Sequence, residues 1–162
     1  MVADGGCAGL IYRLAKRCVA RQRDAFYPPF TAHNENLPIT MNNPLPFADL
    51  ALGAWLSAVP AGTLDELDYG VVEMDTAGLV LRYNQTESNF SGLSAEQVVG
   101  RHFFRDVAPC SNNRRVAQRY EQSALDETID YVLSLRMKPT PVTLRMLKLA
   151  TAPTMYLLVR WT

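Results

Sequence analysis

The side chain best suited to covalent chemistry in this sequence is Cys110, the only cysteine after residue 40. It follows the run His102–Pro109, in a predicted connection between two helical segments, and functional residues are common in such connections. As a thiolate it would be a nucleophile, whereas as a buried thiol it would be inert. No histidine or asparagine partner indicates a protease-like dyad, although His102 is close in the sequence.

A second group of polar side chains is spaced four residues apart: Tyr83, Glu87 and Ser91. If a strand ends near Tyr83 and the chain then turns into a helix, Tyr83 and Glu87 can face the same space. Ser91 could support the tyrosine through a hydrogen bond between the two hydroxyl groups. The alternative is an edge tyrosine and a solvated glutamate.

Composition excludes several classes of function. The 162 residues include 16 basic and 16 acidic side chains, so the net charge is zero and general nucleic-acid binding is not expected. No apolar run is long enough for a membrane-spanning helix, and no membrane partner is expected. Cys7, Cys18 and Cys110 do not form the pattern of a secreted disulfide framework, so we expect a cytoplasmic protein. His33 and His102 lie far from any cysteine pair, so the sequence predicts no metal site.

Residues 1–40 differ from the rest and form a predicted extension. Leu10–Ala25 could be a basic helix that binds a membrane surface or a partner, but its charges exclude a secretory signal. We expect instead a disordered extension, or upstream sequence translated because the start codon was placed too early. Met41 would then begin a single domain, residues 41–162.

The first half of this domain shows two short helices and a hairpin. Apolar spacing predicts a helix over Phe47–Val59, and Thr63–Glu66 has the capping-box spacing of a second helix. Two strands follow, Tyr69–Met74 and Leu79–Tyr83, with turn residues between them.

The second half is predicted to contain further helices and then three strands. Ser94–Gln97 has capping-box spacing, Gly100 closes that helix, and Arg114–Leu125 is a longer helical stretch. The predicted strands are Thr128–Met137, Val142–Leu149 and Met155–Trp161, with Pro139 and Pro141 marking one turn and Pro153 the next. The result is an α+β domain with a five-stranded antiparallel sheet, short helices over one face, and a pocket between the two layers.

Several residues together form a pattern whose order and spacing are more specific for one protein family than any single residue is. They are Tyr83, Asn84, Glu87, Ser91-Gly92, Gly100, Phe103-Phe104, Asp106–Cys110 and Met137. This pattern resembles the photoactive yellow protein family, which are blue-light receptors of the PAS fold. The resemblance covers essentially all of residues 41–162 and none of residues 1–40.

The resemblance implies a role for each matching residue. Cys110 would carry p-coumaric acid (4-hydroxycinnamic acid) as a thioester, and Tyr83 and a protonated Glu87 would donate hydrogen bonds to the chromophore phenolate. Ser91 takes the place of a threonine that bonds to the tyrosine hydroxyl. The remaining implied chromophore neighbours are Phe103, Val107, Ala108 and Pro109 as pocket walls, and Met137, which could also be a plain core methionine.

The implied mechanism is trans–cis isomerisation by blue light, followed by proton transfer from Glu87. The buried carboxylate left behind would destabilise the domain, so that it loosens at its N-terminal helices and exposes a signalling surface. The resemblance therefore implies a receptor and not an enzyme, a monomer, and an unknown downstream signalling protein as partner.

The sequence departs from the family pattern in three places. Leu93 replaces an arginine that covers the chromophore, Leu135 replaces a tyrosine near it, and the connection after Arg114–Leu125 is about four residues shorter. The alternative function is a non-photoactive PAS sensor or interaction domain, in which Cys110 is a redox-active or an inert thiol. An enzyme fits least, because no base–nucleophile pair and no metal cluster is evident.

Overall fold

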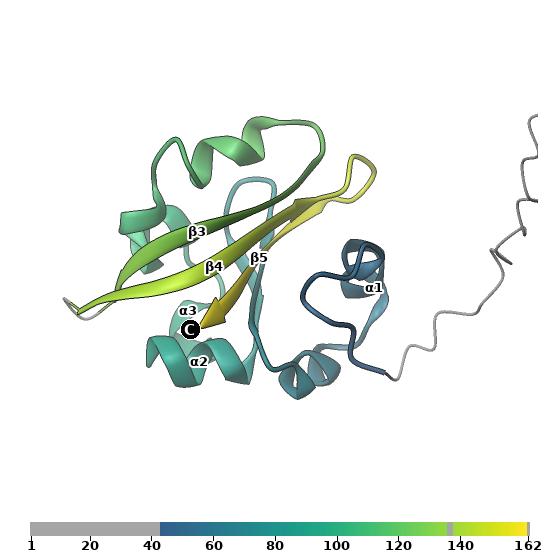
Figure 1. Ribbon diagram of the computed structural model, residues 1–162, viewed down its shortest axis with the longest axis horizontal. Helices are drawn as coiled ribbons and strands as arrows, with labels where there is room; N and C mark the ends of the chain where they lie inside the picture. Colours follow the sequence, from purple (N-terminus) through teal and green to yellow (C-terminus); the bar gives the residue numbers. More distant parts are fainter. Residues whose placement is uncertain (1–42, 136–137, 162) are drawn as a thin grey trace, which may run out of the picture. The chain divides into compact units, whose positions relative to one another are not determined.

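The computed structural model describes residues 43–135 and 138–161 (Figure 1). All of them belong to the unit Pro38–Thr162. The predictions for residues 1–40, for Met41 as a start and for Met137 lie outside the described residues.

A single five-stranded antiparallel sheet organises the described residues, as the sequence predicts. The strands lie in the order β2-β1-β5-β4-β3. Their bounds are Gly70–Asp75 for β1, Val80–Tyr83 for β2, Leu125–Leu135 for β3, Lys138–Lys148 for β4 and Thr154–Trp161 for β5.

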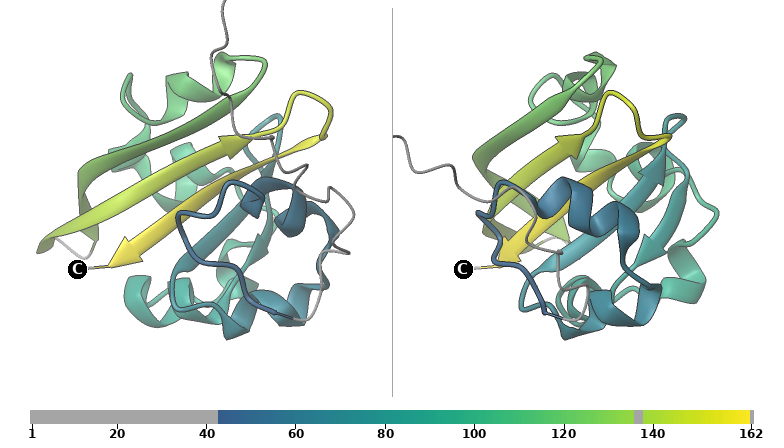
Figure 2. Two further views of the ribbon diagram at one scale, coloured as in Figure 1. Left: turned by 45° about the vertical axis from the view of Figure 1, so that its right-hand side comes forward. Right: turned by 90° about the vertical axis from the view of Figure 1, so that its right-hand side faces the viewer.

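Both faces of the sheet are covered, so the prediction of helices over one face was wrong (Figure 2). Successive residues of a strand point to opposite faces, and in β1 both Val71 and Val72 are fully buried. Val71 packs in one apolar cluster with Leu158 of β5, while Val72 packs in the other with Leu157. Two-sided burial explains why β1 and β5 are apolar along most of their length.

On the first face lie α1 (Leu52–Ala58) and the 3-10 turn η1 (Ala61–Glu66). The predicted helix over Phe47–Val59 is therefore shorter at its start. Arg145 of β4 explains this, because its guanidinium donates to the carbonyls of Phe47 and Asp49 at 2.6 and 2.9 Å and fixes that segment outside a helix.

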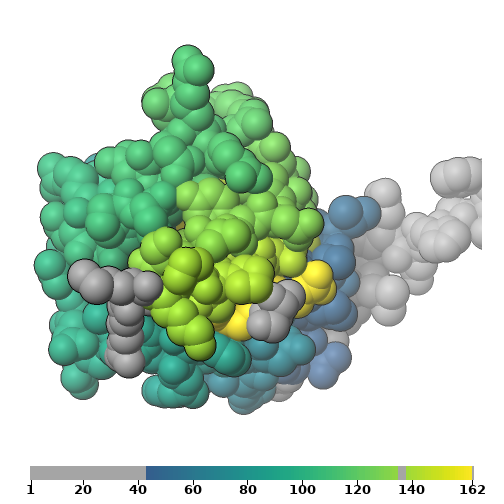
Figure 3. Space-filling model, turned by 60° about the vertical axis from the view of Figure 1, so that its left-hand side comes forward, coloured from purple at the N-terminus to yellow at the C-terminus, as the bar shows by residue number. Residues whose placement is uncertain are grey.

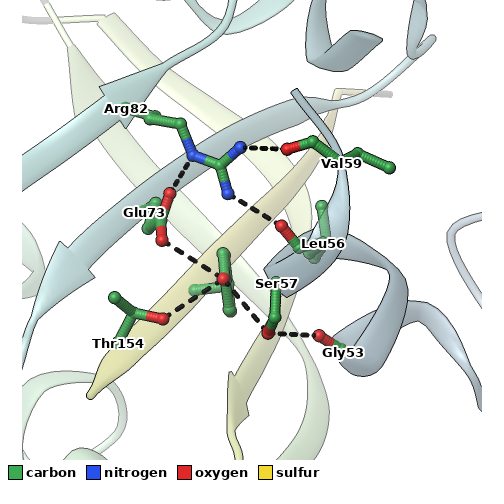
Figure 4. A network of polar contacts seen from close by, with 8 residues as sticks. Gly53, Leu56, Ser57, Val59, Glu73, Arg82 and Thr154 are labelled. Atoms are coloured by element: carbon green, nitrogen blue, oxygen red, sulfur yellow. Dashed lines mark hydrogen bonds and ion pairs between the residues drawn. The ribbon is translucent and has the colours of Figure 1, made fainter. Parts of the chain in front are cut away.

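A polar network fastens the end of α1 to the sheet (Figure 4). Arg82 of β2 donates to the carbonyl oxygens of Leu56 and Val59 at 2.7 and 2.9 Å. The same guanidinium forms an ion pair with the buried Glu73 of β1. Glu73 also accepts the Tyr156 hydroxyl of β5 at 3.2 Å, so three strands share the attachment of α1.

The second face is covered by α2 (Gln85–Ser91), α3 (Ala95–Val98), the π-helical turn η2 (Phe103–Val107) and two 3-10 turns, η3 (Pro109–Ser111) and η4 (Ala117–Glu121). Ser94 and Gln97 form the predicted capping box at α3. The space-filling view shows this layer, in teal and green, beside the yellow-green residues of β4 on one face of the molecule (Figure 3).

The helical stretch predicted over Arg114–Leu125 is much shorter in the structure. That segment contains only the short turn η4 before β3 begins at Leu125. Tyr120 explains the difference, because its hydroxyl donates to the carbonyl of Tyr156 at 2.7 Å and its own carbonyl accepts from Lys148 at 2.6 Å. These bonds hold the segment against the sheet in a tight turn.

Pro139 and Pro141 were predicted to mark a turn, and this was also wrong. Both lie inside β4, opposite Ser134 and Val132 of β3. The described pairs between β4 and β5 run from Val142 to Lys148. A proline lacks the N–H group that a strand donates to its neighbour, so it is tolerated mainly near the end of a strand, and both prolines lie within the first four residues of β4.

Candidate functional site

The junction between β2 and α2 places Tyr83, Glu87 and Ser91 together. β2 ends at Tyr83, and Asn84 is the N-cap of α2. The Asn84 side-chain oxygen accepts the backbone N–H of Glu87 at 3.1 Å, which starts the helix at the point the sequence suggests. Gly92 ends the helix with a φ of 71°, a conformation that glycine adopts without strain.

Asn84 also fastens this junction to two other elements. Its oxygen accepts the N–H of Val71 at 2.8 Å, and its amide nitrogen donates to the carbonyls of Leu64 and Tyr69 at 2.8 and 3.0 Å. The sequence pattern included Asn84 without a role. Its position directly after a strand and before a helix is the signal that could have identified it as a cap.

Replacement of Asn84 by alanine should lower the free energy of unfolding by about 2–4 kcal/mol, because the helix loses its cap and buried carbonyls lose their donor. Urea unfolding of the full chain measures this. Asn89→Ala is the matched control, since Asn89 is exposed on the same helix and bonds only the exposed Gln85 side chain among the described contacts. Equal losses in the two variants would contradict the assignment.

The hydrogen bond predicted between Tyr83 and Ser91 is confirmed. The Tyr83 hydroxyl donates to the Ser91 hydroxyl at 2.8 Å, and both residues are buried. Burial raises the pKa of Tyr83 well above its ordinary value, Glu87 raises it further, and the bond to Ser91 lowers it. The phenol is therefore protonated and able to donate.

Glu87 is a buried carboxyl group, with 3% of its surface exposed. Removal from water raises the pKa of Glu87 to about 8, and a hydrogen bond from Trp161 opposes this rise. Its Oε2 accepts the Trp161 indole N–H at 3.1 Å. At neutral pH the carboxyl group is mostly protonated, which makes it a second donor beside Tyr83.

Gly70, the first residue of β1, leaves the space that Glu87 occupies. A Cβ atom at Gly70 would lie 1.9 Å from Glu87 Oε2 and 2.9 Å from its carboxyl carbon. Any other residue at this position would displace the carboxyl group, so the observed position of the Glu87 side chain depends on glycine here.

Cys110 lies in the turn η3 and is a free, partly exposed thiol. Its carbonyl accepts two hydrogen bonds, from the Asn113 amide at 2.8 Å and from the Tyr131 hydroxyl at 2.7 Å. Pro109 is exposed and occupies the first position of the turn that carries Cys110.

One apolar cluster on the second face of the sheet joins the two halves of the site. Tyr83, Phe103 and Ala108 are buried in it, and Val107 and Cys110 pack against it while partly exposed. Leu93 also packs against this cluster, so an apolar side chain lies where the resemblance would place an arginine.

Trp161, at the end of β5, is the site residue that the sequence reasoning missed. The pattern predicted only a strand there. Strand alternation offers a signal, because Val159 pairs with Gly70 and Trp161 lies two residues further on the same face. The bond to Glu87 spans 74 positions of the chain and is not visible in local patterns.

Neither metal binding nor a membrane span is indicated in the described part of the chain. Residues 43–135 and 138–161 contain no group of three histidine, cysteine or acidic residues arranged to hold a metal ion. Among the same residues, no helix combines the length and hydrophobicity needed to cross a membrane.

The class of protein follows from the fold together with a comparison of families. The model of the PAS fold matches residues 61–159, which is more than half of the chain. The PAS domain of an HTR-like protein from Haloarcula marismortui has a similar fold, with a TM-score of 0.52 at 13% identity, covering 63% of this chain and 93% of that one.

The relatives with higher sequence identity are all named photoactive yellow protein. Photoactive yellow protein from Rhodothalassium salexigens is 30% identical over 60% of this chain and 81% of its own length. The one from Halochromatium salexigens is 34% identical over 52% of this chain and 71% of its own length. The photoactive yellow protein domain of the sensor histidine kinase Ppr from Rhodospirillum centenum is 32% identical, with a TM-score of 0.61, covering 66% of this chain and 97% of that domain. The chain belongs to the photoactive yellow protein family of PAS domains.

Proposed function

We propose that this protein is a blue-light photoreceptor that carries p-coumaric acid as a thioester on Cys110. The observation that supports this most is the burial of Glu87, whose raised pKa keeps the carboxyl group protonated at neutral pH. Burial of a carboxyl group costs free energy unless the group is hydrogen-bonded, and a ligand oxygen that accepts the Glu87 proton would offset this cost. A protonated tyrosine lies beside it, and a free thiol packs against the same apolar cluster as that tyrosine.

These residues fit the two ends of the chromophore. The Cys110 sulfur would attack the activated acyl group, form the thioester and release the activating group. Tyr83 and Glu87 would donate hydrogen bonds to the phenolate oxygen, which is stable in a buried site only with such donors. When bound, the chromophore would absorb blue light and isomerise from trans to cis.

The hydrogen bond between Tyr83 and Ser91 can reverse its direction, which would free the Tyr83 proton for a bond to the ligand. In the structure the Tyr83 hydroxyl donates to Ser91, and the Ser91 oxygen also accepts the N–H of Leu93 at 3.1 Å. A hydroxyl group can rotate and both donate and accept. Rotation of Ser91 so that it donates to Tyr83 would turn the tyrosine proton toward the ligand.

Glu87 would give its proton to the phenolate after isomerisation. The carboxylate that remains lies in a buried site, and an uncompensated buried charge costs several kcal/mol. Such a cost is comparable with the roughly 5–15 kcal/mol of stability of a whole domain, so local loosening can relieve it.

The attachment of α1 to β2 suggests where this loosening would begin. Arg82 directly precedes Tyr83 on β2, and its guanidinium holds the last carbonyls of α1 (Figure 4). A shift of β2 at Tyr83 would therefore disturb the bonds to Leu56 and Val59. We expect α1 and η1 to be released first and to expose a signalling surface.

The partner would be a signalling protein. The similar domain from Rhodospirillum centenum is part of a sensor histidine kinase, which suggests a transmitter of that general kind. The cytoplasmic location, the monomeric state and the absence of enzymatic activity stay predictions.

Reconstitution tests the proposal directly. The full chain is mixed with an activated ester of p-coumaric acid, and the absorption spectrum is recorded before and after blue illumination. We expect a visible band that bleaches and recovers, and Glu87→Gln should shift this band to longer wavelength because a weaker donor localises the phenolate charge less. No visible band with Cys110 intact would contradict the proposal and favour the non-photoactive PAS sensor.

A further inference from the structure

Trp161 holds Glu87 from a strand far away in the sequence. Its indole Nε1 lies 3.1 Å from Glu87 Oε2. Its ring stacks on Phe90 of α2, with ring centroids 5.3 Å apart and an interplanar angle of 13°. Phe90 is three residues after Glu87, so one helix face and one strand end fix the position of the indole.

The indole group is a donor with no acceptor. It can donate to a carboxylic acid or to a carboxylate, but a hydrogen bond to an ionised oxygen is roughly twice as strong. Trp161 therefore favours the charged form of Glu87, in opposition to desolvation, which favours the neutral form.

Within residues 43–135 and 138–161, the charged and titratable groups on the neighbouring elements do not supply another counter-charge. Tyr83 of β2 is neutral, and the exposed Asp65 of η1 accepts the first backbone N–H of α2. Glu73 of β1 and Arg160 of β5 lie on the opposite face, against Arg82 and Phe47 respectively.

We propose that Trp161 is a positioning residue for Glu87: its indole N–H stabilises the carboxylate and thereby sets how readily Glu87 releases its proton. The inference rests on the proposed function for its role in light signalling, where the indole would remain bound to the carboxylate formed by proton transfer. Loss of the indole N–H would make that transfer less favourable and slower.

The test uses the chromophore-free full chain, so it does not depend on chromophore attachment. The sequence holds two tryptophans, Trp55 and Trp161, so two indole N–H signals are expected in a nitrogen–proton NMR spectrum. Trp55→Phe and Trp161→Phe assign them. We expect the Trp161 signal to titrate with a midpoint near pH 8, following Glu87, and to lose this titration in Glu87→Gln.

The matched control is Trp55, whose indole nitrogen is buried in the other apolar cluster and has no hydrogen-bond partner among the residues that the structure describes. Its signal should not follow Glu87. In Trp161→Phe, carboxyl-carbon NMR should show the Glu87 midpoint raised by about half a pH unit or more, because the charge-assisted bond is lost.

Two results would overturn the inference: a Trp161 signal that does not titrate with Glu87, or a Glu87 midpoint that is unchanged in Trp161→Phe. Failure of the proposed function looks different, because a chain that takes up no p-coumaric acid would still show the indole titration. In a chain that does take it up, Trp161→Phe should also slow formation of the bleached state.

Discussion

Replacement of Cys110 by alanine is expected to abolish covalent attachment of p-coumaric acid and, with it, the entire visible band. Alanine offers no nucleophile, and no other cysteine lies in residues 41–162. Intact-protein mass spectrometry of the full chain after reconstitution should show stoichiometric addition in the unaltered chain and none in Cys110→Ala.

The chain provides its own controls for this experiment. Cys7 and Cys18 are also thiols, so a double replacement of both by alanine should leave the adduct and the band unchanged. Cys110→Ser separates nucleophilicity from packing, because serine keeps the size of the side chain but is a weak nucleophile without an adjacent base. Labelling of Cys110→Ala, or loss of the band in the double variant, would place the attachment site elsewhere.

Replacement of Glu87 by glutamine is expected to remove a large pH dependence of stability in the chromophore-free protein. The pKa of Glu87 rises from 4.5 to about 8 on folding. Between these values the folded state keeps a proton that the unfolded state has released. Stability from this group is therefore complete below about pH 4.5 and is lost as the pH rises to 8, by up to roughly 5 kcal/mol at 1.36 kcal/mol per pKa unit.

Urea unfolding of the full chain at a series of pH values measures this slope. The unaltered chain should lose stability from about pH 5 to pH 8, whereas Glu87→Gln should be nearly flat over that interval, because an amide does not titrate there. Glu96→Gln is the matched control, since Glu96 is an exposed carboxyl group on α3. A slope of unchanged size in Glu87→Gln would show that groups other than Glu87 cause the pH dependence and would contradict a raised pKa of Glu87.

Local patterns predicted the elements of the fold well where local bonds decide the structure. The capping box at Ser94 and the hydrogen bond between Tyr83 and Ser91 join residues that are close in the sequence. The order of the five strands along the chain also follows from apolar runs separated by turn residues. The strand bounds differ by a few residues, since β3 begins at Leu125 where the pattern indicated Thr128.

Features made by distant contacts were missed. Arg145 fixes the segment at Phe47, and Tyr120 reaches the backbone of Tyr156, so two predicted helices became shorter or disappeared. The bond between Trp161 and Glu87 has the same origin. In each case one long side chain binds an element that is distant in the sequence. The periodicity of apolar residues within one element does not predict such a contact.

The position of Pro139 and Pro141 in β4 has a consequence for association between molecules. Unpaired N–H and C=O groups along the edge of a sheet are a template on which a strand from a second chain can add. A proline contributes no N–H group to such a ladder, and two prolines at alternate positions remove successive donors on one side. Pro139 and Pro141 therefore weaken any such pairing on that side of β4, because a ladder there lacks two of its donors.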